Sequence, residues 1–284
     1  MVMLPSSVIH KPAAAGGSSY LDSVASSTCC DLDATISASY AGSGQTWANL
    51  IASPADTAAQ TAYDFYLGIN NTATTDDPTF TGSAGSSSAY FAMDGGDYFT
   101  LKSLTSSVPT FWNLARSSQQ FWFAYAFRTP TTGTWSATQG FFGNAWTTTN
   151  VGTLYYSTTA EPAIFGIAND VGANTQTVAP NSTFLNSTDY LCIISVDTST
   201  GTNNVRSWVN ATTASTFSKT WATTTNDPDG NFHIGALSNA GTVQGIAQNG
   251  VRIYHFSCGN AFINDTTAAA IVSHLNTRHG RTYA

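Results

Sequence analysis

The sequence predicts an all-β protein built as a single large domain, and its composition gives two of the reasons. Charged residues make up 9% of the 284-residue chain, against about 25% in average globular proteins. The polar remainder is mainly Ser, Thr, Asn, Gln and Gly, which favour strands, turns and loops over long helices. Hydrophobic residues account for 42% of the chain, enough for a sizeable core. The third reason is a strand-like pattern that recurs along the chain.

The most regular strand is predicted within residues 118–130, "SQQFWFAYAFRTP". Strict alternation places one set of residues on each face of a strand. One face is predicted to carry Phe121, Phe123, Tyr125 and Phe127, and the other Trp122, Ala124, Ala126 and Arg128. Further strands are predicted within residues 28–40, 139–144, 153–158, 163–170, 190–198, 204–212, 232–237 and 250–258. The loop at 198–203 predicts a hairpin, because it carries Gly and Asn between two strands.

Residues 89–101, "AYFAMDGGDYFTL", predict a β-hairpin. Aromatic and apolar residues flank the short segment formed by Asp94, Gly95, Gly96 and Asp97. Asp-Gly and Gly-Gly pairs supply the positive φ angles that a two-residue hairpin turn needs. We therefore expect two paired strands joined at residues 94–97.

A helix is predicted only near the C-terminus. Asn264 and Asp265 are natural N-cap residues, an Ala-rich stretch follows, and Gly280 ends the helix. Residues 1–20 are rich in Pro, Ala, Gly and Ser and predict an N-terminal arm, held by a neighbouring subunit or folded back on its own domain. Residues 21–284 are predicted to form the one sandwich domain.

The order of several segments resembles the concanavalin A-like lectin/glucanase (laminin-G-like) domains of tailed-bacteriophage virion proteins. The matching segments span about residues 28–283 and are "GSGQTWANLIAS" at 42–53, "DDPTF" at 76–80, "YFAMDGGDYFTL" at 90–101, the aromatic strand at 121–127, "IISVDTSTGTNNVRSWVNAT" at 193–212, "HIGAL" at 233–237 and "GVRIYHFSCGNAFIND" at 250–265. The resemblance implies a jelly-roll sandwich of two antiparallel sheets with a short C-terminal helix. It leaves function open, since this fold carries hydrolases, lectins and structural modules.

No catalytic residues are predicted, and the chain is expected not to be an enzyme. The glucanases of this superfamily place two glutamates and an aspartate on one strand, a motif that this sequence lacks. The single glutamate, Glu161, is followed along the chain by Asp170 as the next carboxylate. Nine extended residues span about 30 Å, whereas glycosidase carboxyl groups lie about 5–9.5 Å apart. A Ser–His–Asp triad stays open, because serine is abundant, although no Gly-x-Ser-x-Gly motif supports one.

Two ligand sites are considered. Trp135 and Trp146 lie in loop-like stretches and are the candidates for a sugar-stacking platform or a subunit contact, against the alternative of buried loop tryptophans. Asp227, Asp229 and Asn231 offer oxygen donors for Ca²⁺, but this ion needs six to eight oxygens. A turn at 227–230 explains the same residues without an ion. No cofactor is expected, with Ca²⁺ as the open alternative.

The four cysteines are predicted to be buried thiols, with disulfides as the alternative, and buried thiols suit folding in a reducing cytoplasm. Cys29 and Cys30 are neighbours and are expected on opposite faces of a strand. Nine basic residues are scattered over a chain of net charge −7, so a nucleic-acid surface is not expected. No apolar run of about 18 residues predicts a membrane span, and the N-terminus lacks the basic start and apolar core of a secretory signal.

These observations favour a non-enzymatic structural protein of a phage virion, a capsid decoration or head-fibre subunit on the outer surface of a particle assembled in the host cytoplasm. Its expected partners are sister subunits and the capsid or tail proteins, in a homo-oligomer for which a trimer is one arrangement. The first alternative is a tail-fibre lectin that binds host surface polysaccharide. The second is a polysaccharide-degrading enzyme.

Overall fold

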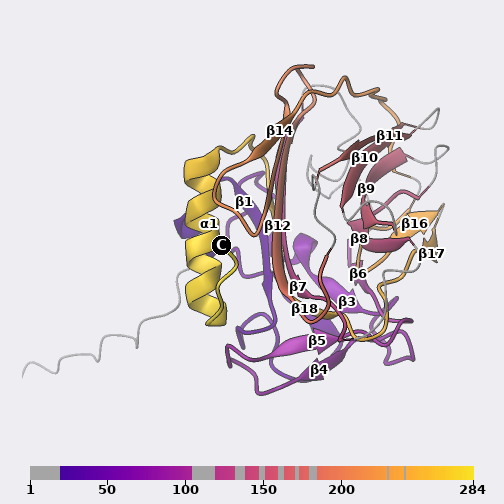
Figure 1. The fold of residues 1–284 in the computed structure, drawn as a ribbon. Coiled ribbons are helices and arrows are strands. Elements are labelled where there is room, and N and C mark those ends of the chain that lie inside the picture. The colour runs from indigo at the N-terminus through magenta and orange to yellow at the C-terminus, as the bar shows by residue number, and fades with distance from the viewer. Residues whose placement is uncertain are drawn as a thin grey trace, which may run out of the picture.

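A computed structural model describes residues 20–103, 119–131, 138–146, 151–158, 163–169, 173–178, 184–228, 230–239 and 241–284. Two antiparallel sheets of eight strands each pack face to face, and a single α-helix of the described residues covers the outer face of the first sheet (Figure 1). A short two-stranded hairpin lies beyond the second sheet, on the side away from the helix. The prediction of an all-β sandwich is confirmed.

The first sheet has the strand order β14–β13–β12–β7–β18–β5–β4, and β1 also pairs with β18. Its strands are β1 (Thr28–Asp33), β4 (Thr79–Thr81), β5 (Tyr90–Ala92), β7 (Gln120–Arg128), β12 (Asp189–Asp197), β13 (Val205–Val209), β14 (Ser215–Phe217) and β18 (Arg252–Gly259). The strands β12 and β13 form the hairpin that the loop at 198–203 predicted.

The second sheet has the order β11–β10–β9–β8–β15–β6–β3–β2. Its strands are β2 (Thr46–Trp47), β3 (Phe65–Leu67), β6 (Phe99–Leu101), β8 (Gln139–Gly143), β9 (Val151–Ser157), β10 (Ile164–Asn169), β11 (Ala173–Thr177) and β15 (His233–Ile234). The outer hairpin consists of β16 (Leu237–Asn239) and β17 (Thr242–Gln244). Two short 3-10 helices, η1 (Leu21–Ser23) and η2 (Gln60–Tyr63), complete the described elements.

Strand β7 divides the interior as its alternation predicts. Phe121, Phe123, Tyr125 and Phe127 belong to the main core between the two sheets. Trp122, Ala124 and Ala126 belong to a second core between the first sheet and the helix. Because both faces of β7 are covered, all seven side chains are buried. Burial of each large aromatic side chain contributes about 1.5–3 kcal/mol.

The turn at 94–97 does not join a hairpin, so that prediction is wrong. Strand β5 lies in the first sheet, where it pairs with β4 and β18, whereas β6 lies in the second sheet, where it pairs with β3 and β15. The tight turn is real: Gly95 has φ +98°, and the carboxylate of Asp97 accepts a hydrogen bond from the backbone N–H of Asp94. Its function is to carry the chain from one sheet to the other.

The adjacent cysteines also differ from their expectation. Cys29 and Cys30 both belong to the main core, because the pairing of β1 with β18 shifts register between Thr28 and Cys30. Such a bulge adds one residue to a strand and breaks the alternation of faces. All four cysteines are buried and free, and burial raises the pKa of Cys192 to about 12.

The helix α1 (Asp265–His279) begins and ends where the sequence predicts. The side chain of Asn264 accepts a hydrogen bond from the N–H of Thr267, and Gly280 adopts the left-handed conformation with φ +60°. Ile271, Val272 and Leu275 pack on the outer face of the first sheet. Within the described ranges, no helix combines the length and apolar character that a membrane-spanning helix requires.

Candidate functional site

A pocket opens on the outer face of the second sheet, beside the β16–β17 hairpin. It has a volume of about 260 Å³ and is lined by Thr138, Trp146, Leu154, Tyr156 and Leu237. The two leucines are buried and form an apolar floor, while the other three side chains are half-buried at the rim. The volume lies just below the range of about 300–1,000 Å³ that is typical of ligand pockets, so it suits one small ring.

The hollow follows from the sequence of β8 and its register with β9. Gly140 pairs with Tyr156, and Gly143 pairs with Leu154. Directly paired residues of an antiparallel sheet share a face, so each lining side chain on β9 stands beside a residue without one. A Cβ atom on Gly140 or Gly143 would lie 2.9 Å from the side chain of Leu237. The two glycines therefore allow Leu237 to lie flat on the sheet as the floor of the pocket.

The ring of Trp146 is positioned by a third glycine. Gly245 follows β17 in the left-handed conformation with φ +54°, and a Cβ atom there would lie 2.6 Å from Cζ3 of Trp146. The indole therefore packs directly against the backbone of Gly245. The structure places the half-buried Trp146 in the lining of the pocket, and its predicted role as a sugar platform or subunit contact stays a prediction, whereas Trp135 lies outside the described residues.

Chemically, the pocket offers flat aromatic surface with neutral polar groups at its edge. Trp146 and Tyr156 contribute aromatic rings to the lining, and Thr138 and Tyr156 carry neutral hydroxyl groups. A sugar ring has an apolar face of C–H groups and an edge of hydroxyls, so the two surfaces are complementary.

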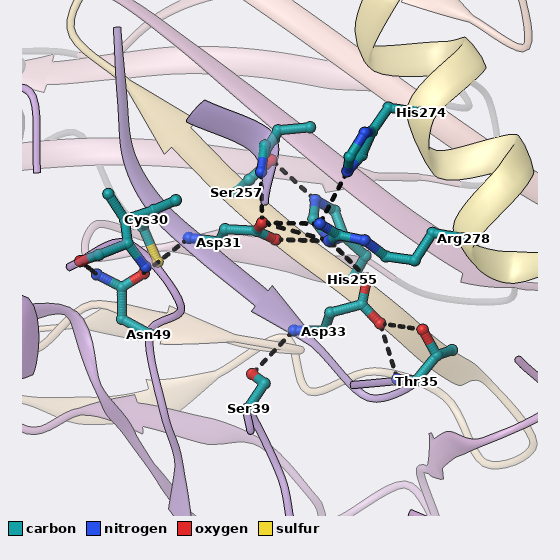
Figure 2. Close-up of polar contacts among 12 residues, drawn as sticks. Cys30, Asp31, Asp33, Thr35, Ser39, Asn49, His255, Ser257, His274 and Arg278 are labelled. Atoms are coloured by element: carbon teal, nitrogen blue, oxygen red, sulfur yellow. Dashed lines mark hydrogen bonds and ion pairs between the residues drawn. The ribbon is translucent and has the colours of Figure 1, made fainter. Parts of the chain in front are cut away.

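A second cluster of chemically active side chains lies beneath α1, where it joins the helix to β1 and β18. Figure 2 shows Arg278 reaching from the helix to two carboxylates of β1. Nη1 of Arg278 lies 3.0 Å from Oδ1 of Asp31 and 3.0 Å from Oδ2 of Asp33. Both aspartates are fully buried, and the arginine side chain is 4% exposed. This cluster is a buried charge network that fixes the helix on the sheet.

The electrostatics of this network favour the ionised form of Asp33. Burial alone would raise the pKa of Asp33, but His279, His255 and Arg278 together hold it well below its usual value. His274 accepts a hydrogen bond at Nε2 from Nη2 of Arg278, at 2.8 Å. Burial and the neighbouring guanidinium lower the pKa of His274 to about 4, so it stays neutral.

The same cluster contains a Ser–His–Asp sequence of contacts. Nε2 of His255 lies 2.9 Å from Oγ of Ser257, and Nδ1 lies 3.5 Å from a carboxylate oxygen of both Asp31 and Asp33. A hydrolase triad needs its serine at an open site, but Ser257 and His255 are both fully buried beneath α1. The arrangement therefore positions the helix and offers a substrate no access.

A metal-ligand set also occurs at this place. Asp33, His255 and His279 present donor atoms that all lie within 4.8 Å of one another. However, Oδ2 of Asp33 is already 3.0 Å from both Nη1 of Arg278 and Nε2 of His279. A cation there would have to displace a guanidinium that neutralises the same oxygen, so these residues do not fit a metal ion. Sequence reasoning missed the cluster because its members are far apart in the chain.

The carboxylates near the 94–97 turn form a third group. Burial and the repulsion of Asp94 and Asp76 raise the pKa of Asp97 to about 7, even though the N–H of Asp94 lowers it. Oδ1 of Asp97 is buried without a hydrogen-bond partner. The side chain of Asp94, by contrast, is exposed. This group is a site of electrostatic strain at the corner between the sheets.

The other predicted positions are only partly described. Asp227 is exposed and Asn231 half-buried, while Asp229 lies outside the described residues. The calcium expectation therefore stays a prediction. Glu161 and Asp170 also lie outside the described residues, as do residues 1–19 of the predicted N-terminal arm.

The sequence matches no protein family model. Nor does it match any curated protein.

The fold, in contrast, is similar to solved structures. A Trypanosoma rangeli sialidase in complex with a 2,3-difluoro sugar acid, 2,3-difluoro-KDN, has a TM-score of 0.52 at 10% identity over 89% of this chain and 33% of the sialidase chain. The binding domain of botulinum neurotoxin serotype D has a TM-score of 0.51 at 9% identity over 91% of this chain and 53% of that chain. This chain thus spans a third to a half of those chains. At such identities the likeness establishes the fold alone, a β-sandwich.

Proposed function

We propose that this chain is a non-catalytic carbohydrate-binding protein and that the pocket at Trp146 and Tyr156 holds the sugar. The single observation that carries the proposal is an aromatic-rimmed pocket with an apolar floor on the outer face of the second sheet. Its size fits one sugar residue, so a single site binds weakly. Affinity for a polysaccharide would come from many copies engaged together.

Two further observations support binding rather than catalysis. The Ser257–His255 pair is closed beneath α1, and the carboxylates Asp31 and Asp33 are bridged by Arg278 instead of facing an open groove. The fold occurs in the binding domain of a botulinum neurotoxin as well as in a sialidase chain. Fold likeness alone leaves both classes open, so the pocket chemistry supports the proposal and the burial of the acidic pair weighs against an enzyme.

A glycan array with the purified chain tests this function, followed by titration calorimetry on the glycans that bind. Trp146→Ala and Tyr156→Ala should each weaken binding about ten-fold or more, because each removes an aromatic surface worth about 1.5–3 kcal/mol. Tyr66→Ala is the matched control, since Tyr66 is a half-buried tyrosine of the same sheet on β3, separated from β8 by β15 and β6. Binding that both pocket variants retain would refute the site, and hydrolysis of a bound glycan would refute the non-catalytic role.

We also propose that the protein is located on the surface of a phage virion. It is supported by the ordered set of segments that resemble phage laminin-G-like domains, which the fold accommodates. As a decoration or head-fibre subunit the chain would use its N-terminal arm, residues 1–20, as an anchor to the shell or to sister subunits. As a tail-fibre lectin it would attach the particle to host polysaccharide.

Imaging of labelled particles locates the chain and separates these placements. A variant that lacks residues 1–20 should lose most of its occupancy on the particle if the arm is the anchor. Full occupancy by the truncated chain would contradict the anchoring role. If no glycan on the array binds and the chain localises to the capsid, a capsid decoration role without glycan binding is favoured.

A further inference from the structure

One long stretch of this chain contains none of its scattered basic residues. Between Arg128 and Arg206, residues 129–205 contain no Lys, Arg or His. This stretch includes β8, β9, β10 and β11, half of the second sheet, together with all the segments that connect them. Four of the five residues that line the pocket, all except Leu237, come from this stretch.

The remaining wall of the pocket is also free of positive charge. Leu237 begins the outer hairpin, and residues 234–251, which contain β16 and β17, have no Lys, Arg or His. The nearest histidine in the chain, His233, is buried in β15, where Nδ1 contacts Oγ1 of Thr100. Burial lowers the pKa of His233 to about 4, so it carries no charge at neutral pH.

The described arginines lie on the first sheet and on the C-terminal segment, and each has a partner there. Arg128 pairs with Asp189, and Arg206 donates to the carbonyl of Ile263. Arg252 lies over the ring of Tyr90, and Arg281 over that of Tyr254. Arg278 is held in the buried network under α1. Their partners hold these guanidinium groups on the first-sheet side of the molecule, whereas the pocket opens on the outer face of the second sheet.

We infer that the pocket accepts an uncharged sugar and discriminates against acidic sugars such as sialic acids and uronic acids. The inference rests on the proposed function and specifies the ligand class of the same pocket. A carboxylate that enters this half-closed pocket loses water and regains no charge-assisted partner among the described residues that line it, which is unfavourable. A neutral sugar with only hydroxyl groups needs no charged partner, and the lining residues Thr138, Trp146 and Tyr156 are all uncharged.

The chain as a whole reinforces this selection. Its net charge is −7, with nine basic residues against sixteen acidic ones. An acidic polysaccharide therefore meets repulsion before it reaches the pocket, and the effect weakens as salt is added. A neutral polysaccharide has no net charge, so this field does not repel it.

Paired neutral and acidic glycans test the inference directly. Titration calorimetry of the full chain compares lactose with 3′-sialyllactose, and N-acetylglucosamine oligomers with the same oligomers carrying a terminal glucuronic acid. In each pair the neutral glycan is expected to bind at least about ten-fold more tightly, and Trp146→Ala should weaken that binding about ten-fold or more. Equal or tighter binding of the acidic partner, lost in Trp146→Ala, would overturn the inference and leave the sugar pocket standing. If no glycan of either kind binds, the proposed function fails and the inference with it.

A variant that gains a positive charge provides a second test of the inference. Thr138→Arg places a guanidinium at the rim of the pocket without touching the leucine floor. It should raise the affinity for the acidic glycan relative to the neutral one by about ten-fold, an effect that declines at high salt. An unchanged preference in a folded Thr138→Arg protein would contradict the idea that missing positive charge determines the selection.

Discussion

Replacement of Arg278 by methionine is the sharpest perturbation of this fold. Methionine keeps most of the side-chain volume but removes the charge and the donors that contact Asp31 and Asp33. Both carboxylates remain fully buried after the change. Arg278→Met therefore separates the loss of a buried ion pair from the loss of packing.

The expected destabilisation at pH 7 is about 3–5 kcal/mol, the usual loss when one partner of a buried ion pair is removed. The two aspartates then lose their arginine counter-ion and keep only the imidazoles of His255 and His279 nearby, so the carboxylate pair takes up a proton more readily. Because that proton is available at lower pH, the difference between wild type and variant should shrink as pH falls from 7 toward 4. A packing defect alone would keep a constant difference.

Urea unfolding followed by tryptophan fluorescence measures both quantities. Thr277→Ala is the matched control, since Thr277 is exposed on the same helix, and it should change the unfolding free energy by less than about 0.5 kcal/mol. Adding Asp31→Asn and Asp33→Asn to Arg278→Met should recover part of the loss, because no buried charge remains. A loss below about 1 kcal/mol in Arg278→Met, or one that is independent of pH, would refute the reasoning.

Three further predictions concern the corner, the pocket and the histidines. Because the pKa of Asp97 is raised to about 7, its ionisation opposes folding as pH rises from about 4 to 7. Asp97→Asn should therefore stabilise the fold by about 1–2 kcal/mol at pH 8 and leave its stability unchanged at pH 4. Thermal melts that show equal gains in stability at both pH values would contradict this. Gly245→Ala should displace the ring of Trp146 and lower sugar affinity about ten-fold. Gly241 has φ +84° and open space around it, so the control Gly241→Ala should cause only backbone strain of about 1 kcal/mol. Titration calorimetry on both variants measures the difference in sugar affinity. The pKa values of His233 and His274 are lowered to about 4, so the unfolded chain binds more protons between pH 6.5 and 4, and stability should fall as pH falls through this window. His233→Gln should reduce the dependence of the urea midpoint on pH between pH 6.5 and 5, and an unchanged dependence would exclude His233 as a cause.

The sequence by itself determined the local elements. The alternation of apolar residues in β7 reports which side chains face which core, because a strand places successive residues on opposite faces. The limits of α1 follow from Asn264 and Gly280, because a helix end depends only on the nearest residues. The hairpin between β12 and β13 was equally predictable from its loop.

The tertiary structure alone decided which strands share a sheet and which side chains meet. Asp94 to Asp97 look like a hairpin turn, but β5 pairs with β4 and β18 whereas β6 pairs with β3 and β15, so the two strands fall in different sheets. Arg278 lies 247 positions from Asp31 and contacts it only because β1 and α1 meet on one face of the first sheet. The pocket likewise depends on the register that sets Gly140 beside Tyr156. Turn and cap chemistry acts between neighbours in the chain, whereas pairing and register are determined by the burial of the whole sandwich.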